Sequence, residues 1–235
     1  MRAVRRTAVV AGLMAVALGV PRDVSAIGGF HAYAVAIQHA PGITGVRGSW
    51  RDFEPGLVHP IVGPNGCFNK ADVNAAVWLL LADGSQLEVG YTVEACGTAG
   101  HLRAYRYFAT TSPTGSQRVV ELDVGGRPSD NLLDRFQPDG RRHTYDIRRT
   151  SDPRQWIFEF DGRTVGSWRS ASVLAGSSVE TGIESYQPDA RVRASFGSLA
   201  IQQDGGWTSW QVSRSVCTRR MSGQSGSARW LAREN

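Results

Sequence analysis

The sequence predicts an all-β protein, folded as an antiparallel two-sheet sandwich. Past residue 26 there is almost no helical periodicity, and short runs rich in Val, Ile, Tyr, Trp, Phe and Thr recur between Gly, Pro, Asp and Asn. About a dozen such runs without intervening helices are typical of a sandwich or jelly roll. A propeller would need a repeat of roughly 40–50 residues, which the chain lacks.

The individual strands follow from these runs and from the turns that separate them. Asp161-Gly162 between two apolar runs predicts a two-residue hairpin, because Gly tolerates the positive φ of a type I′ turn. Asp83-Gly84 and Asp139-Gly140 indicate further turns. The expected strands are His31–Gln38, Thr44–Trp50, Val77–Leu81, Gln86–Val93, Arg103–Thr110, Arg118–Val124, His143–Arg149, Gln155–Phe160, Thr164–Trp168, Val179–Tyr186, Ser195–Gln202 and Trp207–Val212.

Two segments read as long loops. Phe53 to Asn74 is rich in Pro and Gly and has no clear period, so we expect an excursion over one sheet. Arg127 to Gly140 is polar and rich in turn residues, with room for a short helical turn at Asn131–Phe136.

The N-terminus has the three parts of an export signal. Arg2, Arg5 and Arg6 form a positive region, an uncharged stretch follows from Ala8 to Val20, and residues 24–26 (Val-Ser-Ala) fit a signal-peptidase site. We therefore expect residues 1–26 to be a signal peptide and the mature protein to be secreted, by the general or the twin-arginine route. No later segment approaches the ~18 apolar residues of a membrane helix, so we expect no membrane association after cleavage.

Composition fits one domain over residues 27–221, with a loose tail over residues 222–235. The formal charge of the full chain is +5, and the leader carries +3 of it. The remaining charges are interspersed, which argues against a nucleic-acid partner. We expect a monomer.

Three cysteines remain for an oxidising compartment. We prefer a Cys67–Cys96 bridge, because it would tie the long loop to the end of a strand, and it leaves Cys217 outside the bridge. The five histidines are scattered without a metal-ligand spacing, so we expect no metal and no other cofactor.

Acidic residues fall on one face of two predicted strands. Side chains alternate along a strand, so Gln86 and Glu88 share one face of Gln86–Val93, while Glu180, Glu184 and Tyr186 share one face of Val179–Tyr186. If the strands are neighbours, the carboxylates converge on one groove, and mutual repulsion raises one pKa. The alternative is that they are ordinary solvated residues on the polar face of a sheet.

Aromatic residues offer a different site. Tyr105 and Tyr107 share one face of their strand, and such side chains can serve as stacking platforms for sugars. Core packing is the alternative for them, and the expected role of Trp156, Phe158 and Phe160.

Short motifs between residues 44 and 212 resemble the glutamic peptidase (eqolisin) family and its wider set of concanavalin-like sandwiches. They are "GSW", "VWLLL", "LEVGYT", "VETGIESY" and "FGSLAI". The resemblance implies a concanavalin-like jelly roll, with Glu180 at the position of the catalytic Glu. The family's catalytic Gln is replaced by Glu88, with Gln86 two residues upstream.

Three functions remain open from the sequence. The resemblance implies an acid-acting peptidase with an altered pair, in which Glu180 activates water, Glu88 and Gln86 occupy the second position, and an extracellular polypeptide is the substrate. The second is a non-catalytic protein that binds cell-wall or other glycans. The third is a glycoside-acting enzyme that uses Glu88 with Glu180 or Glu184. Glu184, Tyr186, Tyr105 and Tyr107 are the expected substrate-binding residues.

Overall fold

The computed structural model describes the backbone of most of the chain. The described residues are 32–53, 56–57, 67–96, 101–122, 138–185, 190–217, 221–226 and 229–234. Side chains are described for residues 32–53, 73–93, 104–122, 138–185 and 191–217. The predicted signal peptide, the predicted helical turn at Asn131–Phe136 and Tyr186 lie outside the described residues.

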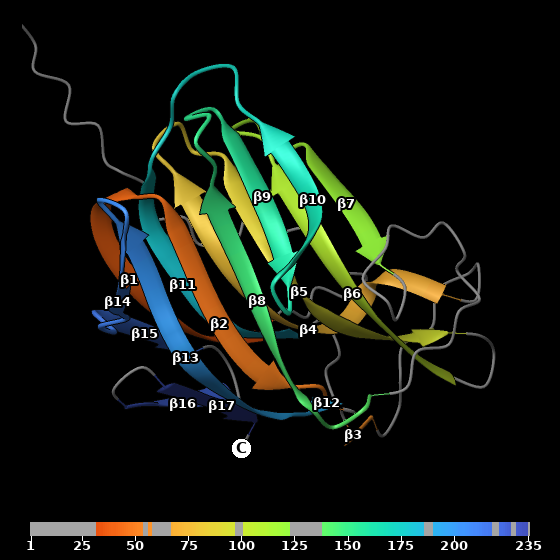
Figure 1. Ribbon diagram of the computed structural model, residues 1–235. Coiled ribbons are helices and arrows are strands. Elements are labelled where there is room, and N and C mark those ends of the chain that lie inside the picture. The colour runs from red at the N-terminus through yellow and green to blue at the C-terminus, as the bar shows by residue number, and fades with distance from the viewer. Residues whose placement is uncertain are drawn as a thin grey trace, which may run out of the picture.

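The described chain is all-β, with two antiparallel sheets stacked face to face (Figure 1). The seven-stranded sheet has the order β15 (Arg214–Cys217), β1 (Ala32–Ile43), β11 (Gly176–Ser185), β4 (Cys67–Leu81), β5 (Gln86–Cys96), β6 (His101–Thr111) and β7 (Gln117–Leu122). The predicted two-sheet sandwich is confirmed.

The eight-stranded sheet lies on the other side of the core. Its order is β10 (Arg163–Arg169), β9 (Gln155–Phe160), β8 (Arg142–Arg149), β2 (Gly45–Arg51), β13 (Arg193–Gln203), β17 (Arg229–Glu234) and β16 (Met221–Gly226), and β14 (Gly206–Ser209) also pairs with β13. A small separate sheet pairs β3 (Gly56–Leu57) with β12 (Ala190–Arg191).

Alternating apolar residues of both sheets form the core between them. Trp50 and Tyr145 stack there with ring centroids 4.0 Å apart, and Phe196 packs on Trp50. Trp156 and Phe158 are fully buried in the same cluster, as predicted. The alternation predicted for Gln86–Val93 is also confirmed, because the core takes Leu87, Val89, Tyr91 and Val93.

The Asp161-Gly162 turn has the predicted geometry. Asp161 has φ 48° and Gly162 has φ 75°, both in the left-handed region that a type I′ hairpin requires. The turn joins β9 to β10 and places the Asp161 carboxylate beside β8.

Two segments expected to be irregular contain strands. The predicted loop from Phe53 to Asn74 includes β3 and the first half of β4, which begins at Cys67 rather than at Val77. Residues 222–235, expected as a loose tail, contain most of β16 and all of β17. In both cases pairing with a neighbouring strand outweighs a weak local preference, since strand propensity depends on context.

Cys67 and Cys96 are directly opposite each other in the register of β4 and β5. Their side chains lie outside the described part of the chain, so the predicted bridge remains a prediction. Cys217 is exposed on β15. Within the described residues, no helix is long and apolar enough to cross a membrane.

Candidate functional site

The candidate site lies on the outer face of the seven-stranded sheet, which we define as the face turned away from the eight-stranded sheet. Three rows of side chains cross the central strands of this face. The first row is Ile37, Glu180, Trp78 and Glu88; the second is Val35, Gly182, Ala76, Gly90 and Tyr107; the third is Tyr33, Glu184, Asn74, Thr92 and Tyr105. Small residues in the middle row separate the polar side chains of the two outer rows.

Glu88 is a buried carboxyl with a specific donor. It is 7% exposed, and the Tyr107 hydroxyl donates a hydrogen bond to its Oε1. Burial, followed by the charge of Glu184, raises the pKa of Glu88 to about 8. Hydrogen bonds from Tyr107 and Trp78 act in the opposite direction. Glu88 therefore holds a proton at neutral pH.

Glu180 and Glu184 lie on the same strand, on opposite sides of Gly182. Burial, followed by the charge of Glu184, raises the pKa of Glu180 to about 7. Glu184 thus interacts electrostatically with both other carboxyls, although it lies in a different row. The register places Glu88, Glu180 and Glu184 on one face, although β4 lies between β11 and β5, so the two strands are not the neighbours that the predicted convergence required.

Asn74 completes the site beside Glu184. Its Nδ2 donates to Glu184 Oε2 at 3.4 Å, and the residue is 8% exposed. Its Oδ1 is buried without a hydrogen-bond partner among the described residues. Asn74 was not among the predicted site residues, because the segment from Phe53 to Asn74 reads as a loop and not as part of β4. The available signal was its even spacing from Trp78, which places both on one face of an extended strand.

The other predicted site residues are distributed as follows. Tyr105 and Tyr107 share the outer face, with ring centroids 6.3 Å apart, and the Tyr107 hydroxyl donates to the Glu88 carboxyl. Gln86 lies on the same face as Glu88, opposite Leu80 and Thr111, at the start of β5.

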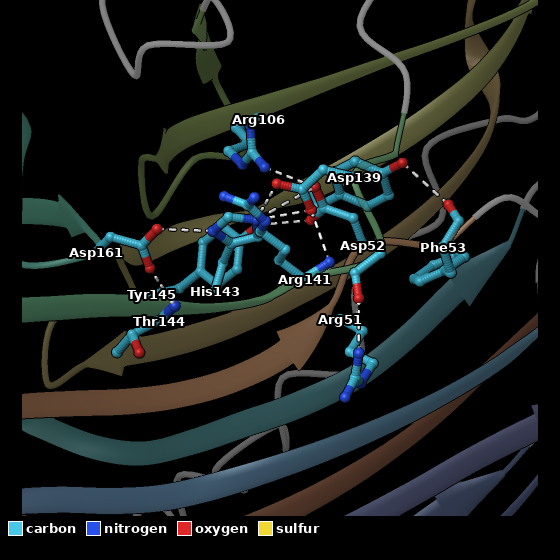
Figure 2. Close-up of polar contacts among 12 residues, drawn as sticks. Arg51, Asp52, Phe53, Arg106, Asp139, Arg141, His143, Thr144, Tyr145 and Asp161 are labelled. Carbon is cyan, nitrogen blue, oxygen red and sulfur yellow. Dashed lines mark hydrogen bonds and ion pairs between the residues drawn. The ribbon is translucent and has the colours of Figure 1, made fainter.

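A second polar cluster lies at one end of the sandwich, between the two sheets, on the faces that they turn toward the core (Figure 2). Arg106 reaches from β6 to Asp52, which follows β2, and their Nη2 and Oδ2 atoms are 2.6 Å apart. His143 on β8 lies between carboxylates: its Nδ1 is 2.7 Å from Asp161 Oδ2, and its Nε2 is 3.1 Å from both oxygens of Asp139. The cluster therefore joins the two sheets.

Asp52, Asp139 and His143 are residue types that bind metals, and their ligand atoms lie within 4.8 Å of one another. The position beside Asp52 Oδ2 is already taken by the Arg106 guanidinium, however. Burial raises the pKa of Asp52 to about 6, against the lowering effects of Arg106 and His143. The residues fit an ion-pair network better than a metal centre.

The outer-face site is suited to acid–base chemistry near neutral pH. A carboxyl whose pKa is raised, partly by the charge of a second carboxyl, is the kind of group by which two glutamates divide the roles of acid and base. The acid-acting peptidase chemistry finds no support here, because it requires an ionised Glu180 in acid. With a pKa of about 7, Glu180 is protonated at acid pH, as is Glu88.

Comparisons with known proteins give distant structural similarities. No known family model matches the sequence, and no curated protein matches it. A tetrameric galectin from the ball sponge Cinachyrella is 11% identical, with a TM-score of 0.39, over 71% of this chain and 98% of the galectin. A β-glucanase from Bacillus licheniformis is 9% identical, with a TM-score of 0.33, over 86% of this chain and 70% of the glucanase.

An endo-1,3-β-glucanase from Streptomyces sioyaensis is 14% identical, with a TM-score of 0.32, over 84% of this chain and 64% of that enzyme. Similarities this distant do not identify a family. None of the comparisons indicates the glutamic peptidase family that the sequence motifs resemble.

Proposed function

We propose that this protein is an exported carbohydrate-active protein, and that its outer-face site hydrolyses a glycosidic bond. The observation that carries the proposal is the raised pKa of Glu88, about 8, next to the charge of Glu184. Hydrolysis of glycosides requires such a pair, one carboxyl protonated to release the leaving group and one ionised to act on water or on the sugar.

In this proposal Glu88 is the general acid and Glu184 is the base. Glu88 protonates the glycosidic oxygen as the bond breaks, while Glu184 accepts a proton from the water that attacks the anomeric carbon. The Tyr107 hydroxyl bonded to Oε1 orients the Glu88 carboxyl. Activity is expected to fall as the pH rises through about 8, because the acid then loses its proton.

Glycan binding without hydrolysis is the second candidate. It is favoured by Tyr33 and Tyr105 on the same face, which are only half-buried and can stack on sugar rings. A protein of this kind would bind a glycan and release no product.

Sugar release by purified protein tests the proposal. Reducing ends are measured on β-1,3-glucan, mixed-linkage β-glucan and β-galactan between pH 4 and pH 9. We expect wild-type activity on at least one polymer, and a loss of ~10²-fold or more in both Glu88→Gln and Glu184→Gln, the typical contribution of a general acid or base. Glu159→Gln is the matched control, because Glu159 is also a buried strand glutamate but lies on the other sheet. Binding without product release would replace hydrolysis by the second candidate.

Export is the first supporting prediction. We expect protein recovered from the culture medium to begin at Ile27, because the leader's three parts end at Ala26. N-terminal sequencing checks this, and secreted protein that still begins at Met1 would refute the cleavage.

The Cys67–Cys96 bridge is the second supporting prediction. Directly opposed residues of antiparallel strands have Cα atoms ~4.5–5.5 Å apart, within the range that a disulfide spans. Closing a loop of about 30 residues is expected to stabilise the fold by ~3–4 kcal/mol. A non-reducing peptide map should link Cys67 to Cys96, and a link from Cys217 to either of them would overturn the pairing.

A further inference from the structure

The outer-face site contains a buried acceptor that the protein does not satisfy. Asn74 Oδ1 has no hydrogen-bond partner among the described residues, although Asn74 is 8% exposed. The amide cannot be turned to satisfy it, because Nδ2 is the group that can donate to Glu184 Oε2 and a turned amide would place two acceptors together. Such an acceptor calls for a donor supplied by a ligand.

The carboxylate beside it requires the same kind of ligand. Glu184 and Asn74 are neighbours in the register, so a carboxylate and an amide oxygen present acceptors side by side. Adjacent hydroxyl groups of a sugar ring donate two hydrogen bonds to such a pair. A sulfate or a uronic carboxylate at this position brings only acceptors and a charge of the same sign.

The charge of the whole face points the same way. Among the residues whose side chains are described, the outer face of the seven-stranded sheet carries four glutamates, namely Glu88, Glu121, Glu180 and Glu184. The register also places Arg103 of β6 on this face, opposite Glu94, and the basic residues whose side chains are described are Arg214, on the edge strand β15, and His39, both exposed. Anionic polymers are bound through arginine or lysine forks, and none of the described outer-face side chains of β11, β4 and β5 is basic.

Aromatic residues stand at both ends of the same row. Tyr33 and Tyr105 flank Glu184, Asn74 and Thr92 in the third row, and both are half-buried. Four strand spacings separate them, about 19 Å. An oligosaccharide that lies across the strands can therefore contact both tyrosines and the acceptor pair together.

We propose that the site selects a neutral glycan, and that Asn74 and Glu184 recognise it by accepting hydrogen bonds from two adjacent hydroxyl groups. This inference rests on the proposed function and adds the substrate class and a specificity-determining residue. Asn74 acts on binding, whereas the proton transfers belong to Glu88 and Glu184.

The test compares a neutral polymer with its charged derivative on the same backbone. The probes are laminarin and β-galactan, each unmodified and chemically sulfated, and binding of the full chain is measured by isothermal titration. We expect binding of at least one unmodified polymer and at least ~10-fold weaker binding of its sulfated form. Equal or stronger binding of the sulfated form would overturn the inference but leave a carbohydrate function standing. Failure to bind or cleave any of these polymers would overturn both.

The Asn74→Leu variant tests the residue itself. Leu has nearly the shape of Asn and no acceptor, so we expect ~10-fold weaker binding of the neutral polymer, about one hydrogen bond. The melting temperature should change little, because the variant removes a buried unsatisfied oxygen together with the Nδ2 donor to Glu184. Gln117→Leu, at the exposed edge of the same sheet, is the control. Wild-type affinity in Asn74→Leu would overturn the assigned role.

Discussion

Replacing Glu88 by Gln is expected to raise the free energy of unfolding at pH 7 by about 3 kcal/mol. The pKa of Glu88 is about 8 in the folded protein and has its ordinary value near 4.5 in the unfolded chain. Between pH 4.5 and pH 8 the unfolded chain loses this proton while the folded protein keeps it. The free energy of unfolding therefore falls by ~1.4 kcal/mol per pH unit. Gln has the same shape, accepts the Tyr107 bond and does not ionise.

The pH dependence distinguishes this effect from a change in packing. Below pH 4.5 Glu88 is protonated in both states, so the variant should gain almost nothing there, and the gain should stop growing above pH 8. Urea unfolding at pH 4 and pH 7 measures the difference. An equal effect at both pH values, or a loss at pH 7, would contradict the raised pKa.

Glu159→Gln provides a control of opposite sign. Hydrogen bonds from Arg148 lower the pKa of Glu159, so its ionisation contributes stability that is present above its ordinary pKa and lost in acid. This variant should be destabilised at pH 7. A stability gain at Glu88 combined with lost hydrolysis would indicate that the buried carboxyl is retained for function.

Replacing Arg106 by Met is expected to lower the free energy of unfolding by about 3–5 kcal/mol. The side chains of Arg106 and Asp52 are 3% and 0% exposed, and their ion pair joins the two sheets (Figure 2). Removing the guanidinium leaves a buried carboxyl whose pKa is already raised by burial. Urea unfolding at pH 7 measures the loss.

The double variant Arg106→Met with Asp52→Leu separates the two contributions. Replacing a whole buried pair by apolar residues is often neutral, so the double variant should recover most of the stability. A double variant no more stable than Arg106→Met alone would show that the loss comes from packing of the Arg106 side chain, which lies 4.3 Å above the Phe160 ring.

Much of the sandwich was predictable because its central strands satisfy local rules. In Gln86–Val93 and Val179–Ile183 the apolar residues alternate with polar ones, so one face is assigned to the core and the carboxyls to the other. The Asp161-Gly162 turn was predictable because its chemistry restricts the backbone.

The remaining features depend on distant parts of the chain. Residues 67–76 form strand because they pair with β5, and from Val73 onward also with β11; β17 forms against β13, although neither segment has a strong strand preference. The Arg106–Asp52 pair joins residues 54 positions apart. A signal for it existed, since the alternation that turns Tyr107 outward turns Arg106 into the core, where it needs a carboxylate partner.

The most direct measurement is the titration of the glutamate side chains by 13C NMR, with the Glu88 signal assigned by its absence in Glu88→Gln. It needs no substrate and reads the proton on which the proposed chemistry depends. The Glu88 carboxyl carbon should titrate near pH 8. A midpoint near its ordinary value of 4.5 would leave the site without a proton donor at neutral pH and contradict the proposed role of Glu88.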